Sequence, residues 1–400
     1  MADNYVSQSG NRAFKEVADV IATFRQETNN RFDASVLGSD YFDDFRQVIN
    51  DLIAIKHGFP LDRAMTSVFQ GANILQNPTM LKPNTNQAGY IFTTRPDLNL
   101  ATENLKANRP MVPLLTTEAN SIMRAIRMIL SPRMAKRLAG EMQGAVKPRN
   151  IVATPLVDPS YPFIAVSDNT VKSLTGWPSS QLGILSGNAG LMKEVHIMAD
   201  GPMTYTHEYS LNLSLDSMKG NATLYLYYFW ILYIGFVVSQ PYGMAPWPEY
   251  LFNGRLDYTT RIYRLIMDET RTYVEEMAAT GYAVPRSIDI GPVFDYQQTA
   301  ENPRPYADKT TEIEFACSGA IYLDEILIQQ FNETVCYFNP LMRHENRLKT
   351  MVKVEKKYQP ILNNKCYPRI DLTTRELEWW CPLATVKNHI RTLKAAATFG

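Results

Sequence analysis

The sequence has no excess of charge of either sign. Lys and Arg total 40 of the 400 residues, and Asp and Glu also total 40. Such a chain lacks the overall positive field that draws proteins to nucleic acids or anionic lipids, so we expect no specific nucleic-acid binding. Residues 341–400 nevertheless hold more basic than acidic side chains. This basic tail suits either docking onto a neighbouring protein or simple solvation.

Cysteine is scarce and poorly spaced for metal binding. The four cysteines are Cys317, Cys336, Cys366 and Cys381, and they form no CxxC pair. No histidine lies at ligand spacing from any of them, whereas zinc sites use closely spaced Cys and His ligands. We therefore predict no metal site, and free thiols in a reducing cytoplasm. The first residues also lack the apolar stretch of a secretory signal.

The common catalytic and phosphate-binding motifs are missing. The sequence holds no GxGxxG after a predicted strand, no GxxxxGK[ST], no GxSxG and no HExxH, and its five histidines are scattered. These motifs mark nucleotide sites, nucleophilic serines and catalytic zinc. We predict no catalytic residues and no cofactor, and hence no enzyme. The alternative is a cytoplasmic hydrolytic enzyme whose site the sequence does not reveal.

One long apolar run is present, at residues 222–238. It is short for a bilayer span, which takes about 20 residues. It also contains four tyrosines, whose hydroxyls need partners that lipid cannot supply, and no cluster of basic residues flanks it. We predict a fully buried helix, apolar on all sides, within a core or between subunits. A membrane anchor is the alternative, and we expect no membrane insertion.

Helical patterns outnumber strand patterns. Residues 256–281 place apolar side chains such as Ile262, Leu265 and Ile266 at spacings of three and four, which predicts an amphipathic helix. Strict alternation predicts strands at 204–216 and 311–319. Asp200-Gly201-Pro202 is expected to turn a hairpin into the first of these strands. The predicted fold class is α+β, helix-dominated, with a small antiparallel sheet and the apolar helix near 222–238.

Three regions are expected along the chain. Residues 1–69 read as an N-terminal helical region, and the Asn- and Pro-rich stretch 70–88 reads as a connection. Residues 70–310 are predicted to form a central α+β core. Residues 311–400 are predicted to form a C-terminal strand and helix region that includes the basic tail.

Three stretches resemble structural proteins of large tailed bacteriophages. They are "GYIFTTRPDLNL" at 89–100, the segment at 249–287 and "FNETVCYFNPLM" at 331–342. The resemblance implies a non-catalytic structural subunit of the contractile tail machine, in the baseplate or neck, that acts through protein–protein assembly. It implies other virion structural proteins as partners, several copies in each particle, and assembly in the host cytoplasm before location in the virion.

Interface residues are the candidates that remain once catalysis is set aside. Pro96 favours an extended chain at Arg95, and Asp97 can then turn the chain while Arg95 reaches outward to a neighbour. The alternative is that Arg95 pairs with a carboxylate of its own chain. Aromatic residues and arginine are enriched at the centres of protein interfaces. The candidates are Arg95, Asp97, Tyr250, Arg255, Trp379 and Trp380.

Overall fold

The computed structural model describes residues 89–134, 154–180, 182–200, 208–239, 243–253, 255–268, 270–294, 310–355, 358–359, 362 and 365–389. Nearly all of them belong to one compact unit, which comprises residues 86–372 and 376–400. The predicted N-terminal helical region 1–69 and the connection 70–88 lie outside the described residues. The three predicted regions therefore stay a prediction.

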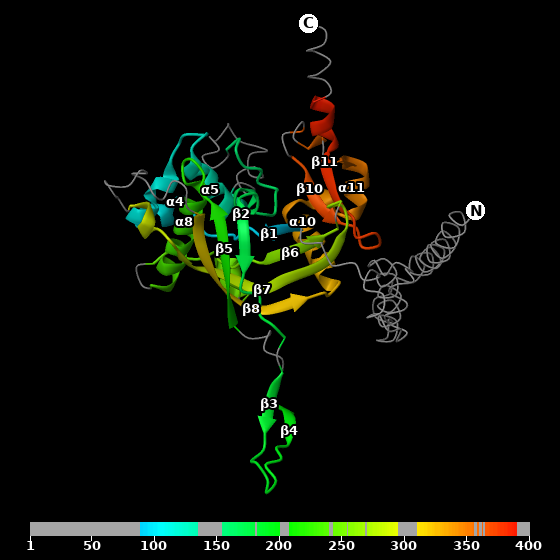
Figure 1. Cartoon of the computed structure of the whole chain (residues 1–400). Coiled ribbons are helices and arrows are strands. Elements are labelled where there is room, and N and C mark those ends of the chain that lie inside the picture. Colours follow the sequence, from blue (N-terminus) through cyan, green and yellow to red (C-terminus); the bar gives the residue numbers. More distant parts are fainter. Residues whose placement is uncertain are drawn as a thin grey trace, which may run out of the picture. The chain divides into compact units, whose positions relative to one another are not determined.

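A six-stranded antiparallel sheet forms the centre of this unit (Figure 1). Each strand pairs antiparallel with its neighbours. The prediction of a helix-dominated fold with a small sheet is therefore wrong. In spatial order the strands are β1 (Gly89–Thr93), β6 (Ile262–Met267), β7 (Val274–Ile288), β8 (Thr310–Tyr322), β5 (Glu208–Asp216) and β2 (Val171–Thr175).

The error comes chiefly from residues 256–281, which form β6 and the first half of β7 rather than a helix. The same apolar residues also fit a period of two, because Tyr263, Leu265 and Met267 alternate and are all fully buried. Aromatic and β-branched residues favour the strand. Asp268 separates β6 from β7, since its carboxylate accepts hydrogen bonds from the amides of Thr272 (2.7 Å) and Tyr273 (2.9 Å).

The other two strand predictions are confirmed. β5 covers most of 204–216, and its leucines at 211, 213 and 215 are buried. β8 covers 311–319, and its buried residues include Ile313, Phe315 and Cys317. The predicted hairpin into β5 is wrong, because β4 (Ile197–Asp200) pairs with β3 (Gly183–Ser186) instead.

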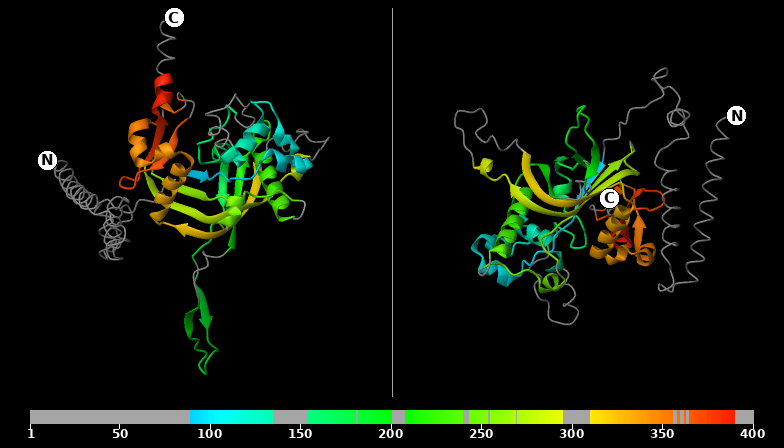
Figure 2. Two further views of the ribbon diagram at one scale, coloured as in Figure 1. Left: turned by 180° about the vertical axis from the view of Figure 1, so that it is seen from behind. Right: turned by 90° about the horizontal axis from the view of Figure 1, so that it is seen from below.

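Two facing glycines let the sheet bend where β7 meets β8. In the register of these strands Gly281 lies opposite Gly319. A Cβ on Gly281 would lie 2.7 Å from the carbonyl oxygen of Gly319, which itself has a φ of +65°. Only glycine tolerates this approach. The sheet curls strongly (Figure 2, right) and nearly closes into a barrel, while β1 and β2 remain its two end strands.

The remaining elements flank this sheet. A second sheet has the order β10 (Tyr367–Ile370), β11 (Leu377–Pro382), β9 (Met351–Lys353). The α-helices are α4 (Thr102–Ala107), α5 (Ile122–Leu130), α7 (Ala165–Asp168), α8 (Ala222–Val238), α9 (Pro248–Phe252), α10 (Ile326–Phe338) and α11 (His344–Thr350), and the 3-10 helices are η3 (Arg109–Leu115), η5 (Gly291–Val293) and η6 (Pro340–Met342).

Two apolar cores hold the layers together. In the first, α8 and α5 pack with the inward side chains of β5 and β8. In the second, α10 and the small sheet pack with β1, β6 and β7. The large sheet is thus covered by different elements in the two cores, which is typical of an α+β domain.

The apolar helix α8 has the predicted bounds. The single chain does not bury it on all sides, so full burial within the chain's own core is wrong, and burial between subunits stays a prediction. Trp230, Tyr227 and Tyr233 are fully buried, whereas Val238 is 70% exposed. A helix that packs on a sheet contacts it along one side, so the rest of its surface stays exposed unless another element covers it.

The buried tyrosine hydroxyls of α8 have hydrogen-bond partners, as expected: Tyr227 contacts Ser167 at 2.8 Å and Tyr233 donates to Asp257. Of the described helices, none has both the length and the apolarity to cross a membrane.

We predict that Trp230→Asp prevents the chain from folding. The indole is fully buried and donates to the carbonyl of Tyr258 at 3.0 Å, so the variant places an unpaired carboxylate in an apolar core. The free energy of unfolding should fall by roughly 3–5 kcal/mol. Soluble yield and thermal melting measure this. Val238→Asp, at the exposed end of the same helix, is the control and should melt like the wild type; a folded Trp230→Asp would contradict the assignment of this face to the core.

Candidate functional site

Arg95 lies inside the protein. The residue is only 5% exposed. Its guanidinium donates hydrogen bonds to main-chain carbonyls of two separate segments. Nε donates to Ile129 (2.9 Å) and Nη1 to Tyr161 (2.9 Å), and Nη2 also donates to Met128. Burial lowers the pKa of Arg95 to about 10, against the opposing charges of Asp158 and Asp97.

The prediction that Arg95 reaches outward is therefore wrong, and so is the alternative of a carboxylate partner as its main contact. The residues around it explain the difference. Residues 92–100 are all buried, although those after β1 form no regular element, so their surroundings must supply hydrogen-bond partners. The side chain of Arg95 extends from this segment and donates hydrogen bonds to the carbonyls at the end of α5. Whether any of the six candidate residues contacts another chain stays a prediction.

Asp97 and Tyr250 are brought together although they are far apart in the sequence. The Tyr250 hydroxyl donates to an Asp97 carboxylate oxygen at 3.1 Å, and Arg133 pairs with the same carboxylate at 2.9 Å. The Arg133 guanidinium also stacks over Tyr250, 5.2 Å from the ring centre. Burial raises the pKa of Asp97, and Arg133 partly opposes that shift. This cluster fixes α9 against the segment that follows β1.

The other three candidates lie at or near the surface. Arg255 is exposed. Trp379 and Trp380 are half-buried neighbours in β11, so their side chains point to opposite faces of the small sheet. The guanidinium of Arg347 lies 4.9 Å from the Trp380 ring centre, and the Trp380 indole donates to Glu378 at 2.9 Å. Both tryptophans thus stabilise the small sheet while keeping some surface open.

The most exposed apolar surface belongs to the hairpin of β3 and β4, which sequence reasoning missed. β3 and β4 pair with each other as a separate two-stranded sheet, which extends beyond the end of β2 (Figure 1). Leu191 is 98% exposed and Met192 is 85% exposed at its tip. Exposed apolar side chains also occupy both strands: Ile184, Leu185, Ile197 and Met198.

Both faces of this hairpin are apolar, because Ile184 and Leu185 are adjacent and so point to opposite sides. A hairpin that packed on its own domain would bury one face. Monomeric proteins seldom expose extended apolar patches unless these bind something. A sequence signal was present in the run "GILSGNAGLM" at 183–192, where apolar pairs flank a turn of small residues.

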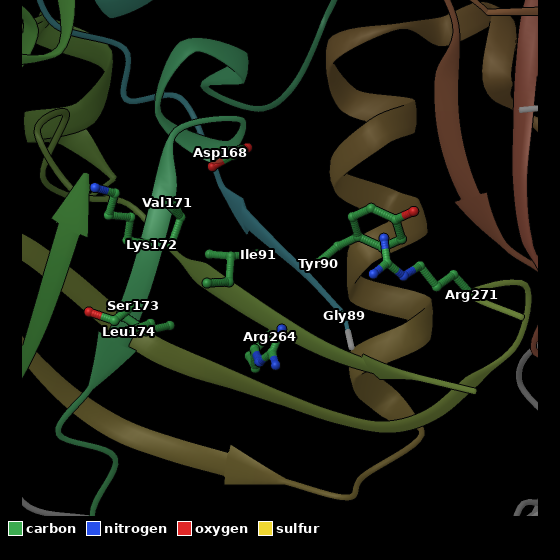
Figure 3. A pocket seen from close by; sticks show the side chains of 10 residues that line it. All are labelled: Gly89, Tyr90, Ile91, Asp168, Val171, Lys172, Ser173, Leu174, Arg264 and Arg271. Carbon is green, nitrogen blue, oxygen red and sulfur yellow. The ribbon is translucent and has the colours of Figure 1, made fainter. Parts of the chain in front are cut away.

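A cavity of about 500 Å³ lies between the two end strands of the large sheet (Figure 3). Ile91 of β1 and Leu174 of β2 point toward this gap from opposite sides. The gap is bridged at one end, where the amide of Thr93 donates to Asp168 at 3.0 Å. Lys172 on its rim pairs with Asp216 at 2.6 Å. The lining thus combines apolar strand residues with charged side chains, of which Lys172 forms an ion pair.

The described residues contain no group of three or more His, Cys, Asp and Glu side chains that could hold a metal ion. Their chemistry is that of packing and hydrogen bonding: an interior fixed by polar contacts, and an apolar hairpin outside it. The arrangement suits contact with another protein surface.

A family model described as "Putative phage tail tube protein" matches residues 29–397. No curated protein matches the chain. Among solved structures, the cap that terminates the tube of the anti-feeding prophage is 14% identical, with a TM-score of 0.26, and the match covers 40% of this chain and 81% of that one. The sheath/tube terminator of an extracellular contractile injection system is 11% identical, with a TM-score of 0.24 and coverages of 38% and 85%. At these TM-scores the likeness is too slight to establish a shared fold.

We predict that Arg95→Ala destabilises the isolated subunit. The variant leaves several buried carbonyls without a donor, so the free energy of unfolding should fall by on the order of 3–5 kcal/mol. Urea unfolding of the purified chain measures it. Arg255→Ala removes the same kind of side chain from the surface and should change stability by less than about 0.5 kcal/mol. Equal stability of the two variants would show that the carbonyls near Arg95 find other partners.

Proposed function

The chain belongs to the phage tail tube protein family, and we propose that it builds a tail tube by assembling with further copies of itself. Membership makes it a structural component of a bacteriophage tail and of the virion. The observation that carries the proposal is the exposed apolar hairpin of β3 and β4. A subunit that polymerises needs a surface that is uncovered in the single chain and covered in the assembly.

The composition of the hairpin suits that use. Between Gly183 and Asp200 the charged side chains are few: Lys193, Glu194 and Asp200. Methionine at the tip adapts to irregular surfaces because its side chain is unbranched and polarisable. Burying Leu191 and Met192 against a neighbour would each contribute about 1.5–3 kcal/mol. Repetition of this contact at every subunit would multiply the effect along the tube.

The rest of the chain supports a fixed platform for that contact. The large sheet contributes to two apolar cores, one with α8 and α5 and one with α10 and the small sheet. The Asp97, Arg133 and Tyr250 cluster fixes α9. The hairpin follows β2 directly, so its position depends on an end strand of this sheet. A firmly built body would then set where each hairpin meets the next subunit.

The family description names the tube, which favours the tube over the predicted baseplate or neck. A contractile tail, contact with other virion structural proteins and assembly in the host cytoplasm stay predictions. Nothing seen in the described residues favours the alternative of a hydrolytic enzyme, so we do not propose it.

We predict that the double variant Leu191→Asp, Met192→Asp folds normally but fails to assemble. Both side chains are almost fully exposed in the subunit, so the melting temperature should stay unchanged. Loss of roughly 3 kcal/mol or more at each contact weakens association at least a hundredfold. Sedimentation and negative-stain microscopy of the purified chain measure assembly.

The matched control exchanges the same two residues, Leu191→Met with Met192→Leu, and conserves apolar volume. It should assemble like the wild type. Normal tubes from the charged variant would remove the hairpin from the interface. A lower melting temperature would instead show that the hairpin packs within its own subunit.

A further inference from the structure

Cys366 and Cys381 face each other across two strands of the small sheet. The register of β10 and β11 pairs Tyr367 with Trp380, and one step further along the ladder places Cys366 opposite Cys381. Opposed residues of antiparallel strands have Cα atoms about 4.5–5.5 Å apart. A disulfide accepts Cα separations of about 4.4–6.8 Å, so a pair at this position lies within the reach of one.

The two thiols are also in contact. Cys366 is 2% exposed and Cys381 is fully buried, and both belong to a small apolar cluster with Leu362. The thiol of Cys366 donates a hydrogen bond to the sulfur of Cys381. The other two cysteines lie elsewhere, since Cys317 is in the first apolar core and Cys336 packs beside the second. All four are free thiols in the structure.

We propose that Cys366 and Cys381 form a redox site, which closes to a disulfide between β10 and β11 under oxidising conditions. The site is distinct from the hairpin and does not depend on the proposed role in assembly. Its reaction partner is a low-molecular-weight disulfide such as oxidised glutathione.

The surroundings assign different roles to the two sulfurs. The hydrogen bond from Cys366 lowers the pKa of Cys381, and the charge of Lys365 adds to this effect. The same bond raises the pKa of Cys366. Because the thiolate is the nucleophile, Cys381 attacks first and Cys366 resolves. Cys366 precedes the first residue of β10 and follows the exposed Lys365, so fraying of this strand end gives the oxidant access.

The exchange balances without any further reactant. The Cys381 thiolate attacks one sulfur of oxidised glutathione, which forms a mixed disulfide and releases one glutathione thiolate. Cys366 then loses its proton and attacks the Cys381 sulfur, which forms the protein disulfide and releases the second glutathione thiolate. The two protein thiols are oxidised, oxidised glutathione is reduced, and the two protons end on the two glutathione molecules.

Such a crosslink would act on the small sheet. It closes the loop between residues 366 and 381 and ties β10 to β11, which also pairs with β9. A crosslink of this kind stabilises mainly by restricting the unfolded chain. A virion leaves the reducing interior of a cell for oxidising surroundings, so the disulfide would form in the released particle and strengthen it there.

The test is incubation of the folded, purified full-length chain with oxidised glutathione, followed by alkylation under denaturing conditions. We expect two alkylated thiols, at Cys317 and Cys336, and a peptide crosslinked through Cys366 and Cys381 by mass spectrometry. The melting temperature should rise by about 5 °C and return to its starting value after reduction. The variants Cys366→Ala and Cys381→Ala should show no such rise.

The double variant Cys317→Ala, Cys336→Ala is the matched control and should keep the redox-dependent rise. Four alkylated thiols after oxidation of the wild type, a lasting glutathione adduct or a different cysteine pairing would each overturn the proposal. Peptide mapping of the oxidised wild type identifies the crosslinked cysteines even where an alanine variant folds poorly.

Discussion

The structure depends on the burial of an irregular segment, residues 94–100, which follows β1. Its polar groups are shut off from water without a helix or a ladder to pair them, so the rest of the fold has to supply partners. The amide of Asp97 bonds to the carbonyl of Asp257 at 3.0 Å, and that of Leu98 bonds to the carbonyl of Leu130 at 2.9 Å. Distant parts of the chain are therefore fixed to one short stretch.

Two arginines complete this arrangement from opposite directions. Arg95 extends from the segment to the carbonyls at the end of α5, and Arg127 of α5 extends back to the carbonyl of Leu100 at 2.9 Å. Burial lowers the pKa of both to about 10, yet both stay protonated at neutral pH. A lysine could not reproduce the contacts of Arg95, because Nε, Nη1 and Nη2 of the planar guanidinium donate to carbonyls of two separate segments.

Elements with a clear local pattern could be predicted from the sequence. The prediction failed for elements whose structure depends on strands far away in the chain. The strands β5 and β8 could be recognised because each carries one clear period, and the helix at 222–238 because it is a single long apolar run. Residues 256–281 fit both periods, and only pairing with β1 and β8 selects the strands. The partner of β4 is the neighbouring strand β3, so that error comes from a local strand that the sequence pattern did not indicate. The inward path of Arg95, in contrast, depends on contacts far along the chain, which one sequence does not reveal. The site was missed for the same reason, since an apolar hairpin looks like a core strand until its burial is known.

The protein buries polar side chains around Arg95 and exposes apolar side chains on the hairpin of β3 and β4. The two arrangements have different physical consequences. Buried hydrogen bonds have fixed directions, so the segment around Arg95 permits one arrangement of the elements that surround it. Apolar contact has no preferred direction, so an exposed hairpin can dock wherever a complementary surface is presented. A body that determines geometry and a hairpin that supplies adhesion are the two properties that the proposed assembly into a tube requires.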